Sequence, residues 1–290
     1  MHSVQVRHDS FHKAMVLQAT APFGKGEAEH PIDRGVYFAD IWFEPLDRPA
    51  TIRPHLSFWS EIARTAAIVE SCRSTPTPVR LADIVARTLN KERALRHHPD
   101  KLAPMRTWVI THGRPRSALE AWGARPHTEP DWPEQGIWRL ATLVPIFVIV
   151  CRELPETPQT LLLRLMGARN TLRRALNELK ACDEPWTHPY KDLLVRRHVM
   201  VAQPHYPRTK DDDDFLQQFA DVADQFVTNL RQEGRQDLLR RLFGLRLQRP
   251  LTDAEADLLR QREDELGTDP LNELVLTATA EEIEAWLAQA

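Results

Sequence analysis

The sequence predicts an α+β protein with a body over residues 1–203 and an all-helical C-terminal extension over residues 204–290. Two observations support this class. Up to about residue 203, short apolar runs typical of buried strands alternate with amphipathic stretches of helical spacing. After the polar segment PHYPRTKDDDD (204–214), no stretch has the composition of a strand, and apolar residues recur at helical intervals.

Composition narrows the class of protein further. The chain is 42% hydrophobic and 27% charged, with a formal net charge of -3, so there is no global attraction to nucleic acid or membrane and any basic surface must be local. Its three cysteines lie far apart and form no CxxC pair, which argues against a disulfide framework or a zinc ribbon. The twelve-residue apolar run 140–151 is too short to cross a bilayer, and no apolar signal core begins the chain. We therefore expect a cytoplasmic protein that does not engage a membrane.

The elements of the body follow from periodicity and from breaks rich in glycine and proline. In chain order we expect a helix over 10–19, a loop over 22–35, strands over 35–46 and 65–72, a helix over 79–98, a strand over 105–113, a short helix over 116–123, a loop over 124–136, a strand over 137–151 and a long helix that starts at Thr157 and Pro158.

The C-terminal extension carries helix signals only. The aspartates at 211–214 suit the N-terminus of a helix, because the backbone dipole there favours negative charge. Capping boxes predict two short helices near the end. We expect the apolar seam of the first helix to pack on the body or on a partner, so that the extension mediates homo-oligomerisation or binds another protein. The seam consists of Phe215, Phe219, Val222, Phe226 and Leu230, and the capping boxes are Thr252 with Glu255 and Thr279 with Glu282.

Asp40 is the first candidate functional residue. It lies in the middle of the apolar strand GVYFADIWFEPL (35–46), whose two faces are apolar apart from Asp40 and Glu44, so we expect both faces to be covered. A buried, isolated carboxylate costs several kcal/mol, and it must be paired, protonated or bound to a cation. Two interpretations stay open: a salt bridge to an arginine, or a cation site.

Glu70 is the second candidate, because it ends the other strong apolar run, AIVESC. If that run is the neighbouring strand, Asp40 and Glu70 converge, and two adjacent carboxylates repel each other unless a cation lies between them. Mg²⁺ favours one or two carboxylates together with waters and a phosphate. The pair therefore predicts a magnesium site.

The order of these elements resembles the PD-(D/E)XK nuclease superfamily, and more narrowly its bacterial branch related to the Rpn-type transposase-associated nucleases. The resemblance rests on HDSFHKAM at the start, on VYFADIWFEP, where Asp40 matches the motif aspartate, and on the ending EGRQDLLRRLFGLRL followed by short helices to IEAWLAQA. It implies a mixed sheet flanked by helices and a Mg²⁺-dependent endonuclease acting on DNA phosphodiesters, with Asp40 and Glu70 as metal ligands.

The sequence departs from the family pattern at one position. The motif asks for lysine two residues after the glutamate, where this chain has Cys72. Lys13 of the first helix is the candidate replacement as a third catalytic residue. The alternative is a catalytically inactive nuclease fold that serves as a binding or scaffolding module.

For contact with nucleic acid, the candidates are arginines of the long helix in the second half of the body. Clustered arginines can neutralise phosphates. The competing interpretation is an ordinary exposed helix face. The residues are Arg164, Arg169, Arg173 and Arg174.

Overall fold

The computed structural model describes residues 10–33, 37–47, 53–72, 74–96, 105–127, 135–140, 145–182, 184–203, 206–247 and 249–288. The chain divides into two compact units, residues 1–223 and 224–290. The division falls inside helix α8 (Lys210–Leu247), whereas the sequence analysis places a boundary at 203/204. Each unit is described by itself.

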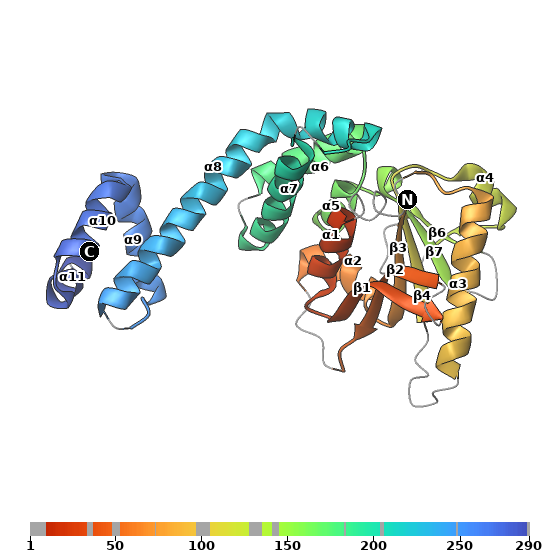
Figure 1. The fold of residues 1–290 in the computed structure, drawn as a ribbon, viewed down its shortest axis with the longest axis horizontal. Helices are drawn as coiled ribbons and strands as arrows, with labels where there is room; N and C mark the ends of the chain where they lie inside the picture. Colours follow the sequence, from red (N-terminus) through yellow and green to blue (C-terminus); the bar gives the residue numbers. More distant parts are fainter. Residues whose placement is uncertain are drawn as a thin grey trace. The chain divides into compact units, whose positions relative to one another are not determined.

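The helices of the first unit surround its sheet and extend beyond it (Figure 1). They are α1 (Ser10–Thr20), α2 (Ser57–Ile62), α3 (Pro78–Arg96), α4 (Arg116–Ala121), α5 (Leu161–Leu165), α6 (Arg169–Ala181), α7 (His188–Val201) and the first part of α8, with 3-10 turns η1 (Pro54–Leu56), η3 (Cys151–Glu153), η4 (Pro158–Thr160) and η5 (Pro185–Thr187).

The sheet of the first unit has seven strands in the described residues, in the order β1-β2-β3-β4-β7-β6-β5. Strands β3, β4 and β7 run parallel to one another, and the remaining neighbours pair antiparallel. The strands are β1 (Gly24–Asp33), β2 (Tyr37–Pro45), β3 (Ala66–Cys72), β4 (Met105–Thr111), β5 (Arg125–Pro126), β6 (Ile137–Arg139) and β7 (Ile146–Val150).

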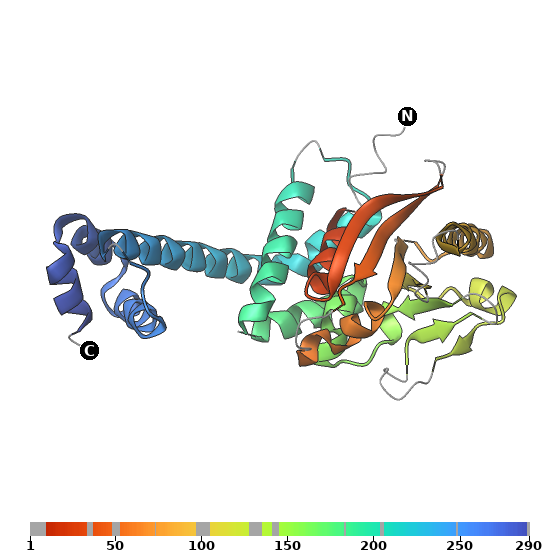
Figure 2. The ribbon, with the colours of Figure 1, turned by 90° about the horizontal axis from the view of Figure 1, so that it is seen from below.

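Helices α1 and α3 lie on opposite faces of this sheet (Figures 1 and 2). β3 and β7 are apolar over most of their length and buried throughout, which is the pattern of strands covered on both faces. On the α3 side, Leu81 and Ile84 pack with Val109 of β4 and Val148 of β7 in one core cluster. The mixed sheet flanked by helices is thus confirmed, and so is the α+β class.

Most of the predicted elements of the body are present. The helices predicted over 10–19, 79–98 and 116–123 correspond to α1, α3 and α4, and the strands predicted over 35–46, 65–72 and 105–113 correspond to β2, β3 and β4. The short helix α2 and the short strand β5 were not predicted.

The loop predicted over 22–35 is wrong, because this segment forms β1 and pairs with β2. Gly24 and Gly26 were interpreted as loop residues, but their role is close packing. A Cβ at Gly24 would lie 2.2 Å from the carbonyl oxygen of Glu44, and one at Gly26 would lie 2.4 Å from Cδ2 of Leu17. Glycine in a strand commonly marks such a close approach.

Two long predicted elements, a strand and a helix, are each divided into shorter elements in the structure. The strand predicted over 137–151 is two antiparallel strands, β6 and β7. The long helix predicted from Thr157 is broken into η4, α5 and α6. A Cβ at Gly167 would lie 2.9 Å from the carbonyl oxygen of Arg164, and Arg169 has φ +52, so the chain turns sharply between α5 and α6.

The second unit is all-helical, as predicted for the extension. It contains the later part of α8 together with α9 (Asp253–Leu266), α10 (Thr268–Thr277) and α11 (Ala280–Leu287), which share one apolar cluster. Both predicted capping boxes are present, at the starts of α9 and α11. Of the aspartates predicted at a helix start, Asp211, Asp212 and Asp213 lie in the first turn of α8, and Asp214 follows them.

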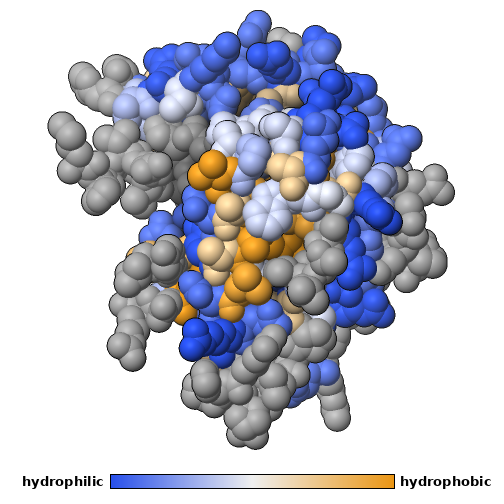
Figure 3. Space-filling view, turned by 90° about the vertical axis from the view of Figure 1, so that its right-hand side faces the viewer, coloured by the Kyte–Doolittle hydropathy of each residue, from blue (hydrophilic) through white to orange (hydrophobic). Residues whose placement is uncertain are grey.

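Figure 3 looks onto the side of the molecule at the right of Figure 1, where α3 lies, and shows hydrophobic residues gathered within a hydrophilic surround. Val79 and Leu89 of α3 are 72% and 44% exposed. Among the described residues, none of the helices has both the length and the apolarity needed to span a bilayer.

Candidate functional site

The two predicted acidic residues meet where the pairing of β2 with β3 ends. Ile41 lies opposite Val69 in antiparallel register, and the next position of that register sets Asp40 beside Glu70. Here a side chain replaces the backbone ladder, because the backbone N–H of Ser71 donates to Oδ2 of Asp40 at 3.0 Å. The structure therefore brings the two carboxylates together on adjacent strands.

Glu70 is fully buried, with 0% of the residue exposed. Nη2 of Arg87 donates to its Oε2 atom at 2.9 Å, and Nη2 of Arg80 lies 3.8 Å from the same oxygen. The Nη1 atom of Arg87 also donates to the carbonyl oxygen of Phe38 at 3.2 Å. The arginine partner that was considered for Asp40 is thus found on Glu70, and α3 supplies it.

The pKa of Glu70 is raised from its usual value of 4.5 to about 8. Removal of the carboxyl group from water is the largest cause, and the charge of Asp40 is the second. Arg87, Arg80 and a backbone N–H of Asp40 act in the opposite direction without cancelling the rise. The Oε1 atom of Glu70 is buried and has no hydrogen-bond partner among the described residues.

The environment of Asp40 is more open, with 19% of its side chain exposed. The Nζ atom of Lys13 lies 3.9 Å from Oδ1 of Asp40 and 3.4 Å from Oε1 of Glu29 on β1. The first helix therefore places Lys13, the predicted third residue, beside Asp40. The expectation that both faces of the strand are covered holds for Trp42 but not for Phe38, which is 49% exposed.

Cys72 occupies the position where the family motif has lysine. It is buried, and burial raises the pKa of its thiol to about 12. Arg80 hydrogen-bonds to it and contributes an opposing effect. Cys72 itself therefore carries no charge at neutral pH, and the positive charge near this position comes from Arg80 and Arg87.

Four further residues lie around the acidic pair. Arg80 and Arg87 are seven positions apart on one helix, which places them on the same face, and this spacing could have identified them. The other two are His12 and Ser71, whose Nδ1 and Oγ atoms lie 2.8 Å apart. No local pattern could have shown that contact, because it depends on how α1 packs against β3.

The four predicted nucleic-acid contacts do not form one exposed set. Arg164 is 2% exposed, and its Nη2 atom lies 2.6 Å from Oε2 of Glu178, so this guanidinium is a buried ion pair and not a surface contact. The remaining three are exposed on α6. Arg173 donates to Asn170, and Arg174 pairs with Glu156; the third is Arg169.

Among the described residues, no group of three or more His, Cys, Asp or Glu side chains is arranged to hold a metal ion. The predicted magnesium site contains two carboxylates, so its protein ligands are fewer than such a group requires. Mg²⁺ is usually held by one or two carboxylates, with water and phosphate as its other ligands.

Comparison with known proteins gives no further guidance. No family model matches the chain, and neither a curated protein nor a solved structure matches it. The resemblance to the PD-(D/E)XK nucleases stays a prediction.

Proposed function

We propose that this protein is a Mg²⁺-dependent endonuclease-like hydrolase that acts on DNA phosphodiesters, with Asp40 and Glu70 as metal ligands and Lys13 beside them. One observation carries the proposal. Two carboxylates from adjacent strands converge, and the charge of Asp40 adds to the effect of burial in raising the pKa of Glu70. A divalent cation is the simplest group that relieves such repulsion.

The donor set is compatible with such an ion. The Oε2 atom of Glu70 is engaged by Arg87, but its Oε1 atom is buried and has no hydrogen-bond partner among the described residues. Asp40 retains an exposed fraction of 19%, so an ion at its carboxylate remains accessible to water and to a phosphate. Bound there, Mg²⁺ would neutralise charge on the phosphodiester.

The surrounding residues have separate roles in this proposal. Arg87 holds the carboxyl group of Glu70 and the backbone of β2 in fixed positions. Lys13 supplies a positive charge beside Asp40 that can stabilise a phosphate oxygen as negative charge develops on it. Ser71 orients Asp40 through its backbone N–H and is itself joined to His12.

The test compares purified wild-type protein with Asp40→Asn and Lys13→Met on plasmid and single-stranded DNA in Mg²⁺ and Mn²⁺. We expect each substitution to lower the cleavage rate about 100-fold or more. Glu44→Gln is the matched control, because Glu44 is exposed on the same strand and accepts a hydrogen bond from Trp42 that an amide oxygen can also accept. Cleavage that survives Asp40→Asn would show that the hydrolytic site lies elsewhere.

The second candidate is a catalytically inactive nuclease-like fold that acts as a binding or scaffolding module. The contact of Arg87 with Glu70 favours it, because a guanidinium at 2.9 Å supplies positive charge that a metal would otherwise supply. Cys72 also favours this candidate, because it occupies the position where the family motif has lysine. This candidate predicts no cleavage with either metal and no heat of Mg²⁺ or Mn²⁺ binding in calorimetry.

A further inference from the structure

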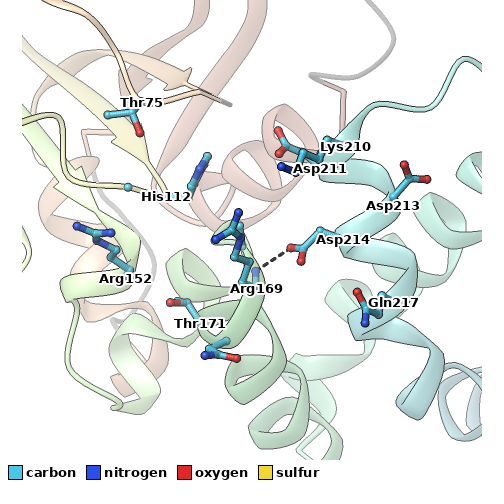
Figure 4. A pocket seen from close by; sticks show the side chains of 13 residues that line it. Thr75, His112, Arg152, Arg169, Thr171, Lys210, Asp211, Asp213, Asp214 and Gln217 are labelled. Carbon is cyan, nitrogen blue, oxygen red and sulfur yellow. Dashed lines mark hydrogen bonds between the residues drawn. The ribbon is translucent and has the colours of Figure 1, made fainter.

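A cavity lies at the carboxyl ends of the parallel strands (Figure 4). Its volume is about 650 Å³, within the range of roughly 300–1,000 Å³ that is common for small-ligand sites. Thr75 follows β3, His112 and Gly113 follow β4, and Arg152 follows β7. In open sheets with parallel strands, ligands bind preferentially at this edge.

The wall formed by the strand ends and the start of α6 carries two guanidinium groups, those of Arg152 and Arg169, together with the His112 side chain. Figure 4 shows Arg169 directed towards His112, with Arg152 at the left of the cavity. Neither arginine has an ion-pair partner among the described residues. In contrast, Arg164 and Arg174 are each paired with a glutamate. Two unpaired guanidinium groups that line one cavity indicate an anionic ligand.

The opposite wall is acidic and belongs to the first turns of α8. Asp211, Asp213 and Asp214 line it together with Lys210, and Oδ2 of Asp214 accepts the backbone N–H of Arg169 at 2.8 Å. Because these three carboxylates repel an anion, a phosphate group is favoured at the side of the cavity where Arg152 and Arg169 lie.

A chain of contacts links this cavity to the acidic pair. The Ser71 N–H donates to Asp40, and the Ser71 hydroxyl is 2.8 Å from His12. His12 and His112 line one small hollow, which shares His112 and Asp214 with the larger cavity. A ligand in the cavity would thus lie next to a hollow that is also lined by His12, the partner of Ser71.

We propose that His112, Arg152 and Arg169 form a phosphate-binding site that holds one phosphate of a single DNA strand, at a position separate from the phosphodiester at Asp40. The inference rests on the proposed function for the identity of the ligand as DNA. The anionic character of the ligand follows from the cavity alone.

The experiment measures the binding of a fluorescent single-stranded oligonucleotide to the full chain by anisotropy. The Asp40→Asn background and a chelator keep the DNA intact, so binding is measured independently of cleavage. We expect Arg152→Met with Arg169→Met to weaken binding about tenfold or more and to reduce the salt dependence of the dissociation constant. Arg125→Met is the control, because Arg125 is exposed on β5 outside the cavity and is not a predicted nucleic-acid contact.

A second double variant distinguishes loss of the binding site from loss of folding. Asp211→Asn with Asp213→Asn removes negative charge from the opposite wall, and we expect it to tighten binding several-fold. A misfolded protein would not bind more tightly, so opposite effects of the two double variants support the site.

Three results would overturn the inference: unchanged binding after loss of both arginines, an equal loss in the Arg125→Met control, or inorganic phosphate binding as tightly as the oligonucleotide. The proposed nuclease function and the proposed phosphate-binding site can be disproved by different results. Arginine-dependent binding without any cleavage removes the nuclease function alone, whereas cleavage that depends on Asp40 but not on Arg152 and Arg169 removes this site alone.

Discussion

Glu70 illustrates how a single buried carboxyl group can make stability depend on pH. Its pKa is raised to about 8 in the folded chain against a usual value of 4.5. Between these values the folded state binds a proton that the unfolded state does not, so the free energy of unfolding falls as pH rises through this window. The contribution is complete below pH 4.5 and is lost above pH 8.

The variant Glu70→Gln tests this sign. We expect the wild-type protein to lose stability between pH 5 and pH 9, by on the order of a few kcal/mol relative to the variant, whose side chain does not titrate. Thermal unfolding in the presence of a chelator measures the difference without interference from divalent ions. If the difference between the two proteins does not change with pH, the carboxyl group of Glu70 is ionised throughout.

Gly24 shows a second residue-scale effect, because it lies where β1 approaches β2 closely. A Cβ there would lie 2.2 Å from the backbone oxygen of Glu44 and 2.3 Å from the ring of Phe43. We expect Gly24→Ala to destabilise the first unit by about 1–3 kcal/mol, measured by chemical denaturation. Lys25→Ala on the same strand is the control and should cost much less.

These residues also mark what could be predicted from the sequence. Asp40 and Glu70 were identified because charges interrupt two otherwise apolar runs, and the register of β2 and β3 brings them together. Arg87 on Glu70 was not foreseen, since hydrophobic periodicity places a helix but does not specify which of its arginines turns inward. Gly24 and Gly26 led to the wrong prediction of a loop where β1 forms, because glycine permits both turns and close strand packing.

At the scale of elements, the start of α9 is held by a cap with an added ion pair. Thr252 and Glu255 form the capping box, and Arg249 donates to both carboxylate oxygens of Glu255 at 2.9 and 2.7 Å. The hydrogen bond from Arg249 is the main reason that the pKa of Glu255 is lowered from 4.5 to about 2. This contribution to stability is present above pH 4.5 and is lost as pH falls towards 2.

We therefore expect Glu255→Gln to lower the stability of the second unit at neutral pH, with the difference from the wild type disappearing between pH 4.5 and pH 2. Hydrogen exchange of amides in α9 provides the measurement, because it reports on this helix separately. Asp264→Asn, at an exposed position of the same helix, is the control. A difference that persists at pH 2 would assign the effect to something other than ionised Glu255.

Element boundaries were predicted well where caps and prolines mark them and poorly where an apolar run continues. The capping boxes of α9 and α11 were correct because their geometry is local. The run 137–151 was assigned to one strand, although it contains β6 and β7. Continuous hydrophobicity indicates burial, but it does not show where the chain reverses direction.

At the scale of the whole molecule, the first part of α8 belongs to the first unit. Phe215, Phe219 and Val222 are each 1% exposed or less, and Phe215 lies 6.4 Å from Phe11 between ring centroids. Burial of three such side chains contributes about 5 kcal/mol or more, which is comparable with the total stability of many domains.

Truncation tests this assignment. A chain that ends at Ala223 should unfold cooperatively, whereas one that ends at Lys210 should be strongly destabilised or aggregate, because its apolar surface against α8 becomes exposed. Circular dichroism and light scattering distinguish the two. Equal stability of both fragments would place the boundary of the first unit at the position predicted from the sequence, 203/204.

The three cysteines differ in burial, and they should therefore differ in reactivity. Cys72 and Cys151 are buried with thiol pKa values raised to about 12, whereas Cys182 is partly accessible. Because the thiolate is the reactive form, an alkylating reagent should label Cys182 first and reach the other two only when the surrounding strands transiently separate. The rate at which mass spectrometry detects the label on Cys72 and Cys151 would then measure how often these strands separate, with no engineered cysteine needed.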